Sequence, residues 1–135
     1  MHDIRNLKQG CSLNYILDIS PESFQLDKIK QVFFTANTIF VNAVMGFTPN
    51  FSEGTIALDL LINENKQASK LFGGGDTLQE LKTLLPKIYK PALENDKFYF
   101  FTGGGTILKA IEQGSAAGLS PIHALLKKNQ IKSKN

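Results

Sequence analysis

Four short runs rich in β-branched and aromatic residues divide the chain. They cover residues 15–19, 38–44, 69–72 and 98–102. The runs are nearly continuous apolar stretches, and they lack a regular alternation of apolar and polar positions. This pattern is typical of strands buried on both faces of a parallel sheet that helices cover. The sequence therefore predicts four parallel strands.

Helical periodicity follows each predicted strand. Ser20 is positioned to cap a first helix that has Pro21 at its first position. A second helix is expected over residues 52–63, where apolar residues recur on one face. A third helix is expected to begin at Thr77, which has capping-box spacing to Glu80.

The last two predicted helices complete a regular order of elements. Pro86 is expected to bend or end the third helix. A fourth helix follows Gly105 and has Gly114 at the position of a C-terminal cap glycine, and a short final helix over residues 121–127 has Ser120 as its cap. The order βαβαβαβα with right-handed crossovers predicts an α/β fold. It is a parallel twisted sheet with flanking helices, a Rossmann-like three-layer half domain.

The composition fits a single soluble domain. The chain has 135 residues, of which 42% are hydrophobic, and this is enough to build one core. No apolar run reaches the length of about 18 residues that a membrane helix needs, and charges occupy the first ten residues. We therefore expect a cytoplasmic protein with no membrane segment. Cys11 is the only cysteine and no histidine pair has ligand spacing, so neither a disulfide within the chain nor a zinc site is expected.

The positive charge is concentrated at the C-terminus. The net charge is +3, but four of the lysines lie after residue 126. A solvated end accounts for them better than a nucleic-acid arm does, so no nucleic-acid partner is expected. The only arginine is Arg5. This scarcity matters because small, multiply charged phosphate substrates are usually recognised by several guanidinium groups.

Two segments repeat one local pattern. KLFGGGDTLQEL and YFFTGGGTILKA both lead from a predicted strand through three glycines into a helix. Backbone N–H groups are unpaired at such a helix start, and glycine leaves room for an anion. A tight turn accounts for one triplet at least as well, but two triplets at one edge of a parallel sheet favour a phosphate site. Neither triplet matches the P-loop or the GxGxxG dinucleotide fingerprint.

Two residues after the first triplet have two interpretations each. Asp76 is favourable next to a helix start without any ligand, and it could also hold Mg²⁺ that bridges nucleotide phosphates. Thr77 could serve only as the helix cap, or it could also donate to a phosphate oxygen.

GGGDT, the later TGGG, DISPESF and TIFVNAVMGF occur in the order and approximate spacing of the C-terminal domain of phosphoglycerate kinases. The chain resembles this nucleotide-binding domain from about residue 13 to residue 127. The resemblance implies an N-terminal extension over residues 1–12, a partial nucleotide-binding domain over residues 13–128 and a basic tail over residues 129–135. It also implies ADP or ATP with magnesium as the ligand.

The resemblance assigns roles to particular residues. The expected nucleotide-binding residues are Asn42, Gly74, Gly75, Asp76 and Thr77, and Asp76 also serves the magnesium ion. The glycines expected next to the transferred phosphoryl group, where helix N-termini stabilise charge, are Gly103, Gly104 and Gly105.

The chain also departs from the family pattern. The family typically has WNGPxGVFE where this chain has VNAVMGFTP, so Asn42 and Gly46 are kept but the glutamate that holds the ribose has no counterpart. Lys109 stands where the family often has an acid. The sequence also lacks the phosphoglycerate-binding domain and the phosphate-binding lysine that the family has.

These features lead to three hypotheses. The first is a homologue of phosphoglycerate kinase, a glycolytic phosphotransferase, which alone binds nucleotide weakly and is inactive. The second is a non-catalytic remnant or subunit that associates with a missing N-terminal half or with itself, because half a sheet leaves an edge strand and an apolar face. The third, nucleic-acid binding through the lysine tail, has the least support, since the rest of the chain has no basic stripe.

Overall fold

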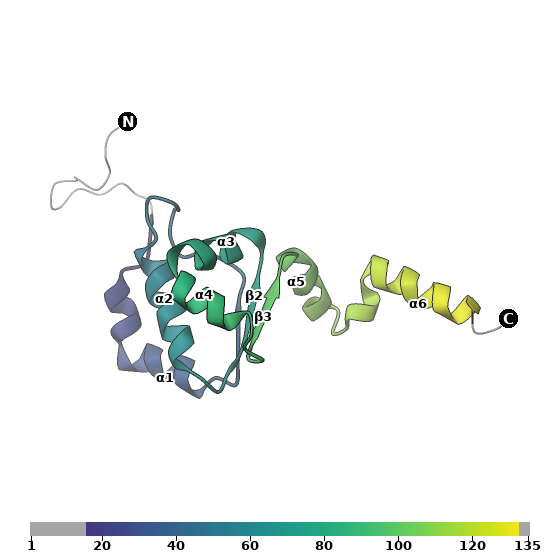
Figure 1. Ribbon diagram of the computed structural model, residues 1–135, viewed down its shortest axis with the longest axis horizontal. Helices are drawn as coiled ribbons and strands as arrows, with labels where there is room; N and C mark the ends of the chain where they lie inside the picture. Colours follow the sequence, from purple (N-terminus) through teal and green to yellow (C-terminus); the bar gives the residue numbers. More distant parts are fainter. Residues whose placement is uncertain (1–15, 133–135) are drawn as a thin grey trace.

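The computed structural model describes residues 16–132. Its centre is a parallel sheet of three strands in the order β1 (Thr38–Val41), β2 (Ser69–Gly73) and β3 (Phe98–Phe101) (Figure 1). The predicted α/β class with a parallel sheet and flanking helices is confirmed. The predicted extension over residues 1–12, with Arg5 and Cys11, lies outside the described residues.

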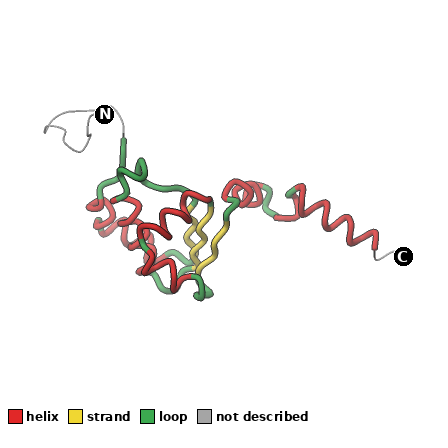
Figure 2. Tube along the Cα trace, turned by 45° about the horizontal axis from the view of Figure 1, so that its top comes forward, coloured by secondary structure: helices red, strands yellow, loops and turns green. Residues whose placement is uncertain are grey.

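The helices lie on the two sides of this sheet in unequal number. Along the chain they are η2 (Pro21–Gln25), α1 (Asp27–Thr35), α2 (Glu53–Glu64), α3 (Gly75–Leu84), α4 (Pro86–Ala92), α5 (Gly104–Glu112), η3 (Ala116–Gly118) and α6 (Ser120–Lys132). Helices α1 to α4 gather on one side, whereas α5 and α6 lead away from the other (Figures 1 and 2). No helix within residues 16–132 is both long and apolar enough to cross a bilayer.

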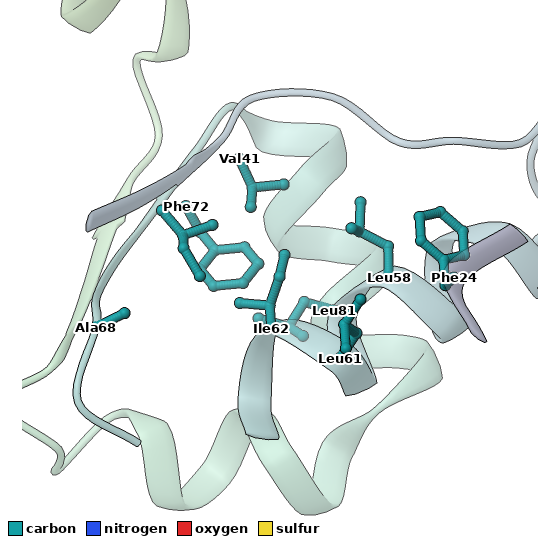
Figure 3. Packing of buried hydrophobic residues seen from close by; sticks show 9 residues of the cluster. Phe24, Val41, Leu58, Leu61, Ile62, Ala68, Phe72 and Leu81 are labelled. Carbon is teal, nitrogen blue, oxygen red and sulfur yellow. The ribbon is translucent and has the colours of Figure 1, made fainter. Parts of the chain in front are cut away.

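The core fills the space between the sheet and helices α2 and α3. Val41 and Phe72 are register partners on adjacent strands, and they project from one face of the sheet toward Ile62 of α2 and Leu81 of α3 (Figure 3). Phe72 is only 1% exposed, and its ring stacks against that of Phe98 and lies tilted against that of Phe100. These apolar contacts hold the ends of β2 and β3 in fixed positions, and those ends carry the two glycine triplets.

The opposite face of the sheet is less covered than the sequence predicts. Phe40, Leu71 and Tyr99 are register partners on this face, and Tyr99 is 47% exposed. The strands are therefore buried on one face only, and the expectation of burial on both faces is wrong for the described chain. The apolar runs look continuous because aromatic residues also occupy the second face.

The predicted first strand over residues 15–19 is not formed within residues 16–19, and Tyr15 lies outside the described residues. This segment passes the start of α2, where no strand is available for pairing. The Asp18 carboxylate accepts hydrogen bonds from the N–H groups of Ile19 (2.8 Å) and Gly54 (3.0 Å). A carboxylate at a helix N-terminus is favourable, so Asp18 anchors the segment to α2 instead of to the sheet.

Other element boundaries differ in detail. The first helix is divided into η2 and α1 by Leu26, which is extended, and the Ser20 side chain does not cap it. The second strand ends at Val41, three residues earlier than expected. The second helix matches its prediction within one residue, and Ser52 precedes it as the N-cap residue. The final helix is longer than residues 121–127 and continues into the predicted basic tail, whose residues 133–135 are not described.

The capping-box prediction for the third helix is wrong. Helix α3 begins at Gly75, two residues before Thr77, and no side chain caps it. Pro86 ends the helical pattern as expected but also begins α4, because Leu85 adopts a non-helical conformation between the two helices. At the end of α5 the prediction is confirmed, since Gly114 has φ +65° and its N–H donates to the Ile111 carbonyl (3.0 Å).

Asn65 joins α1 to the turn before β2. Its amide nitrogen donates to the carbonyls of Phe33 (2.8 Å) and Ala36 (2.9 Å), and its side-chain oxygen accepts from the N–H groups of Gln67 and Ala68 (both 3.0 Å). With a longer bond to the Phe34 carbonyl (3.3 Å), this buried side chain contacts five backbone groups at the end of α1 and in the turn before β2.

Candidate functional site

Helices α3 and α5 begin side by side at the carboxyl edge of the sheet. Each follows its strand after one or two residues, so their N-terminal turns project from β2 and β3. The N–H of Gly74 donates to the carbonyl of Phe101 (2.9 Å), which ties the first glycine loop to the second. Within residues 16–132 the N–H groups of Gly75, Gly104 and Gly105 donate to no protein acceptor. Such unpaired N–H groups and the two helix dipoles favour an anion here.

Asn42 lies where the two glycine loops meet. A side-chain carbon added at Gly73 or Gly74 would come within 3.1 Å or 3.3 Å of the Asn42 amide oxygen, and one added at Gly104 would overlap it. At Gly104 the same carbon would also lie 3.0 Å from the Gly74 nitrogen. The two loops and Asn42 therefore approach one another so closely that Gly104 has no room for a side chain.

A cavity of about 690 Å³ opens beside this junction. The predicted site residues that line it are Asn42, Gly74, Gly103, Gly104 and Gly105. The structure thus brings together the second triplet, one glycine of the first triplet and the asparagine from the end of β1, although these residues come from three separate parts of the sequence.

The other predicted residues do not line the cavity. Gly75 and Asp76 are exposed in the first turn of α3, and Thr77 is buried beneath that turn. Within the described residues no three acidic, histidine or cysteine side chains come together as a metal site. Asp76 therefore offers one carboxylate, which fits a Mg²⁺ ion only when phosphate oxygens and water supply the remaining ligands.

The glycines of the two triplets have different reasons to be glycine. Gly74 has φ +97°, a conformation that other residues rarely adopt, and Gly104 has no space for a side chain. By contrast, a side-chain carbon at Gly75 or Gly105 would meet nothing within 4 Å. Protein packing does not require glycine at these two positions.

Sequence reasoning missed several residues that line the cavity. Lys109 forms part of the wall, together with Thr102, Thr106, Leu119, Ser120 and Pro121. Lys109 was noted only as a departure from the family pattern. Helical spacing offers the signal that could have found it, since Lys109 lies four residues after Gly105 on the same helix face.

Comparisons with known proteins point to one family. The phosphoglycerate kinase family profile matches residues 2–114. The phosphoglycerate kinase of Francisella tularensis subsp. novicida is 36% identical over 111 residues, which is 81% of this chain and 26% of that protein. The enzyme of Limosilactobacillus reuteri is 30% identical over 108 residues, 78% of this chain and 25% of that protein.

A solved structure gives a related match. The phosphoglycerate kinase of Coxiella burnetii is 28% identical, with a TM-score of 0.47 over 66% of this chain and 21% of that one. The chain thus spans about a quarter of the length of the curated relatives it matches. Because the family profile covers most of the sequence, the chain belongs to the phosphoglycerate kinase family.

Proposed function

We propose that the cavity between the two glycine loops binds the phosphates of ADP or ATP, and that this chain alone does so weakly and without turnover. The observation that carries the proposal is a cavity lined by Gly74, which immediately precedes α3, and by Gly104 and Gly105, whose N–H groups are unpaired at the start of α5. Phosphate groups are suited to such a site because backbone N–H donors and helix dipoles both favour negative charge.

Lys109 supports this proposal by its charge. Among the described residues that line the cavity, it is the one charged side chain. It lies on α5, the helix that begins with Gly104 and Gly105. We therefore assign it the role of neutralising phosphate charge, a role that an acid at this position would oppose.

Asp76 would hold the magnesium ion when nucleotide is present. Its exposed carboxylate belongs to the first turn of α3, two residues after Gly74 of the cavity wall, and can reach an ion on the nucleotide phosphates. The adenosine end has less support, since no glutamate corresponds to the ribose-binding residue of the family. We expect a dissociation constant in the high-micromolar range or weaker, because each lost contact costs about 1 to 3 kcal/mol.

The test is a titration of MgADP into the ¹⁵N-labelled chain, followed by NMR and by calorimetry. Saturable shifts are expected at Gly74 and at residues 103–106. Lys109→Gln should lower the affinity that these shifts report about tenfold, the effect of losing one charge-assisted contact. Lys82→Gln removes the same charge from an exposed position of α3 outside the cavity and should leave affinity unchanged. No response at millimolar nucleotide would refute the proposal.

A second candidate function is self-association, which the uncovered sheet face favours. Phe40, Leu71 and Tyr99 present apolar surface there, and Tyr99 is exposed. Exposed apolar patches of this kind often mark protein contacts. Sedimentation equilibrium of the unchanged chain and of Tyr99→Lys tests self-association. A dimer that the substitution dissociates supports it, and a monomer at high concentration excludes it.

A further inference from the structure

A second cavity lies at the opposite edge of the sheet from the glycine loops. Its volume is about 260 Å³, and it lies between the end of α2, helix α4 and the first residue of β3. Its polar lining residues are Asn63, Lys66, Lys87 and Asn95, and Ile88 and Phe98 form part of its apolar wall. None of the described residues that line it is acidic.

The polar groups of this cavity are mainly hydrogen-bond donors. Lys66 uses one of its three donors on the Asn63 carbonyl (2.6 Å). The side-chain oxygen of Asn95 already accepts from the Lys97 N–H (2.9 Å), which leaves its amide nitrogen as a donor. No ion pair with Lys66 or Lys87 occurs in the part of the chain that the structure describes. The two lysines and the Asn95 amide nitrogen thus give the cavity several donors, and its acceptors are neutral amide oxygens.

A buried lysine contacts one wall of the cavity. Lys70 is only 1% exposed on the central strand β2. Its ammonium group donates to the Ala68 carbonyl (3.0 Å) and lies 4.9 Å from the centre of the Phe98 ring, the same ring that lines the cavity. Lysine is almost never fully buried without a charged partner. Burial, together with the charges of Lys66 and Lys97, lowers the pKa of Lys70.

We propose that this cavity binds a small, multiply charged oxyanion, held by Lys66 and Lys87 and by the Asn95 amide, with Lys70 as a buried lysine behind the Phe98 wall. Lys66 and Lys87 line the same cavity, and an anion bound between them would be attracted by both charges. The volume is sufficient for phosphate or pyrophosphate. The site is separate from the proposed nucleotide site, and its occupancy does not depend on that proposal.

Inorganic phosphate is the probe for this site. The ¹⁵N-labelled full chain is titrated with phosphate at constant ionic strength, with chloride as the reference anion. Saturable amide shifts are expected over residues 63–67 and 95–98. The double substitution Lys66→Gln/Lys87→Gln replaces two exposed side chains, and it should weaken the binding that these shifts report at least about tenfold, since hydrogen bonds to charged groups are among the strong ones.

Control variants separate the possible results. Lys82→Gln should bind phosphate at this cavity like the unchanged chain, and Lys109→Gln should affect only shifts at residues 103–106. Lys70→Met keeps an unbranched side chain in the core and should also weaken binding. The proposal is overturned if phosphate shifts residues 63–67 and 95–98 no more than chloride does, or if the double substitution leaves their titration unchanged.

Discussion

Asp59 provides a direct test of the energetics of the core. This residue lies on the buried side of α2, is 5% exposed, and has Leu58 and Ile62 as buried neighbours on the same helix. Burial raises the pKa of Asp59 from its ordinary value of 3.8 to about 7. No hydrogen bond or ion pair with its carboxylate occurs within residues 16–132, so the charged form lacks compensation.

The magnitude follows from the shift. One pKa unit corresponds to about 1.4 kcal/mol, so a rise from 3.8 to about 7 corresponds to an upper limit of about 4 kcal/mol. The unfolded chain loses this proton near pH 3.8, whereas the folded chain keeps it until about pH 7. Between these values the folded state binds more protons, so stability falls as the pH rises through this window and is constant above it.

Urea unfolding followed by circular dichroism at several pH values between 4 and 8 measures the effect. Asp59→Asn keeps the shape of the side chain but cannot ionise, so this variant should lose most of the fall in stability and be more stable than the unchanged chain at pH 8. Asp96→Asn, at an exposed position in the turn before β3, should retain the fall. Equal pH dependence in Asp59→Asn and the unchanged chain would refute the reasoning.

Four further outcomes are expected. Asn65→Ala should reduce the free energy of unfolding by about 2 to 4 kcal/mol in urea titrations, because buried backbone groups lose their partner; a loss below 1 kcal/mol would contradict the role of Asn65 as a link. Gly104→Ala should disrupt the loop junction and lower the melting temperature, whereas Gly105→Ala should fold normally and weaken MgADP binding; equal effects on folding would contradict the packing argument. Asp76→Asn should remove the magnesium-dependent part of ADP binding in calorimetry, and unchanged magnesium dependence would leave Asp76 only as a helix-start acid. A coupled assay should detect no phosphoglycerate kinase turnover with the isolated chain, and robust activity free of host enzyme would overturn the proposed inactivity.

The sequence predicts the glycine loops well because their requirements are local. A strand followed by glycines and a helix leaves few conformations open, and both loops occur at the expected edge of the sheet. The strand over residues 15–19 failed for the opposite reason. A strand needs a partner strand, and apolar composition alone does not show that Asp18 accepts a hydrogen bond at the start of α2 while the segment stays outside the sheet.

The start of α3 was predicted wrongly because two residues within four positions, Gly74 and Thr77, both favour a helix start. Thr77 and Glu80 have capping-box spacing, but Gly74 adopts φ +97° and starts the helix earlier. Buried polar residues were equally hard to foresee. Lys70 follows a polar residue, Ser69, within the strand, and only the three-dimensional packing shows that its ammonium group lies over the Phe98 ring instead of in solvent.

The glycines that packing does not require give the strongest argument for a ligand. Gly74 and Gly104 would be needed in an inactive remnant too, because one has φ +97° and the other has no space for a side chain. Gly75 and Gly105 lie in the first turns of α3 and α5 with open space beside them. Alanine favours a helix interior over glycine by up to about 1 kcal/mol, so stability alone gives no reason for glycine at these positions. Close approach of a ligand to the backbone does give one, since a side chain there would stand between the anion and the unpaired N–H groups.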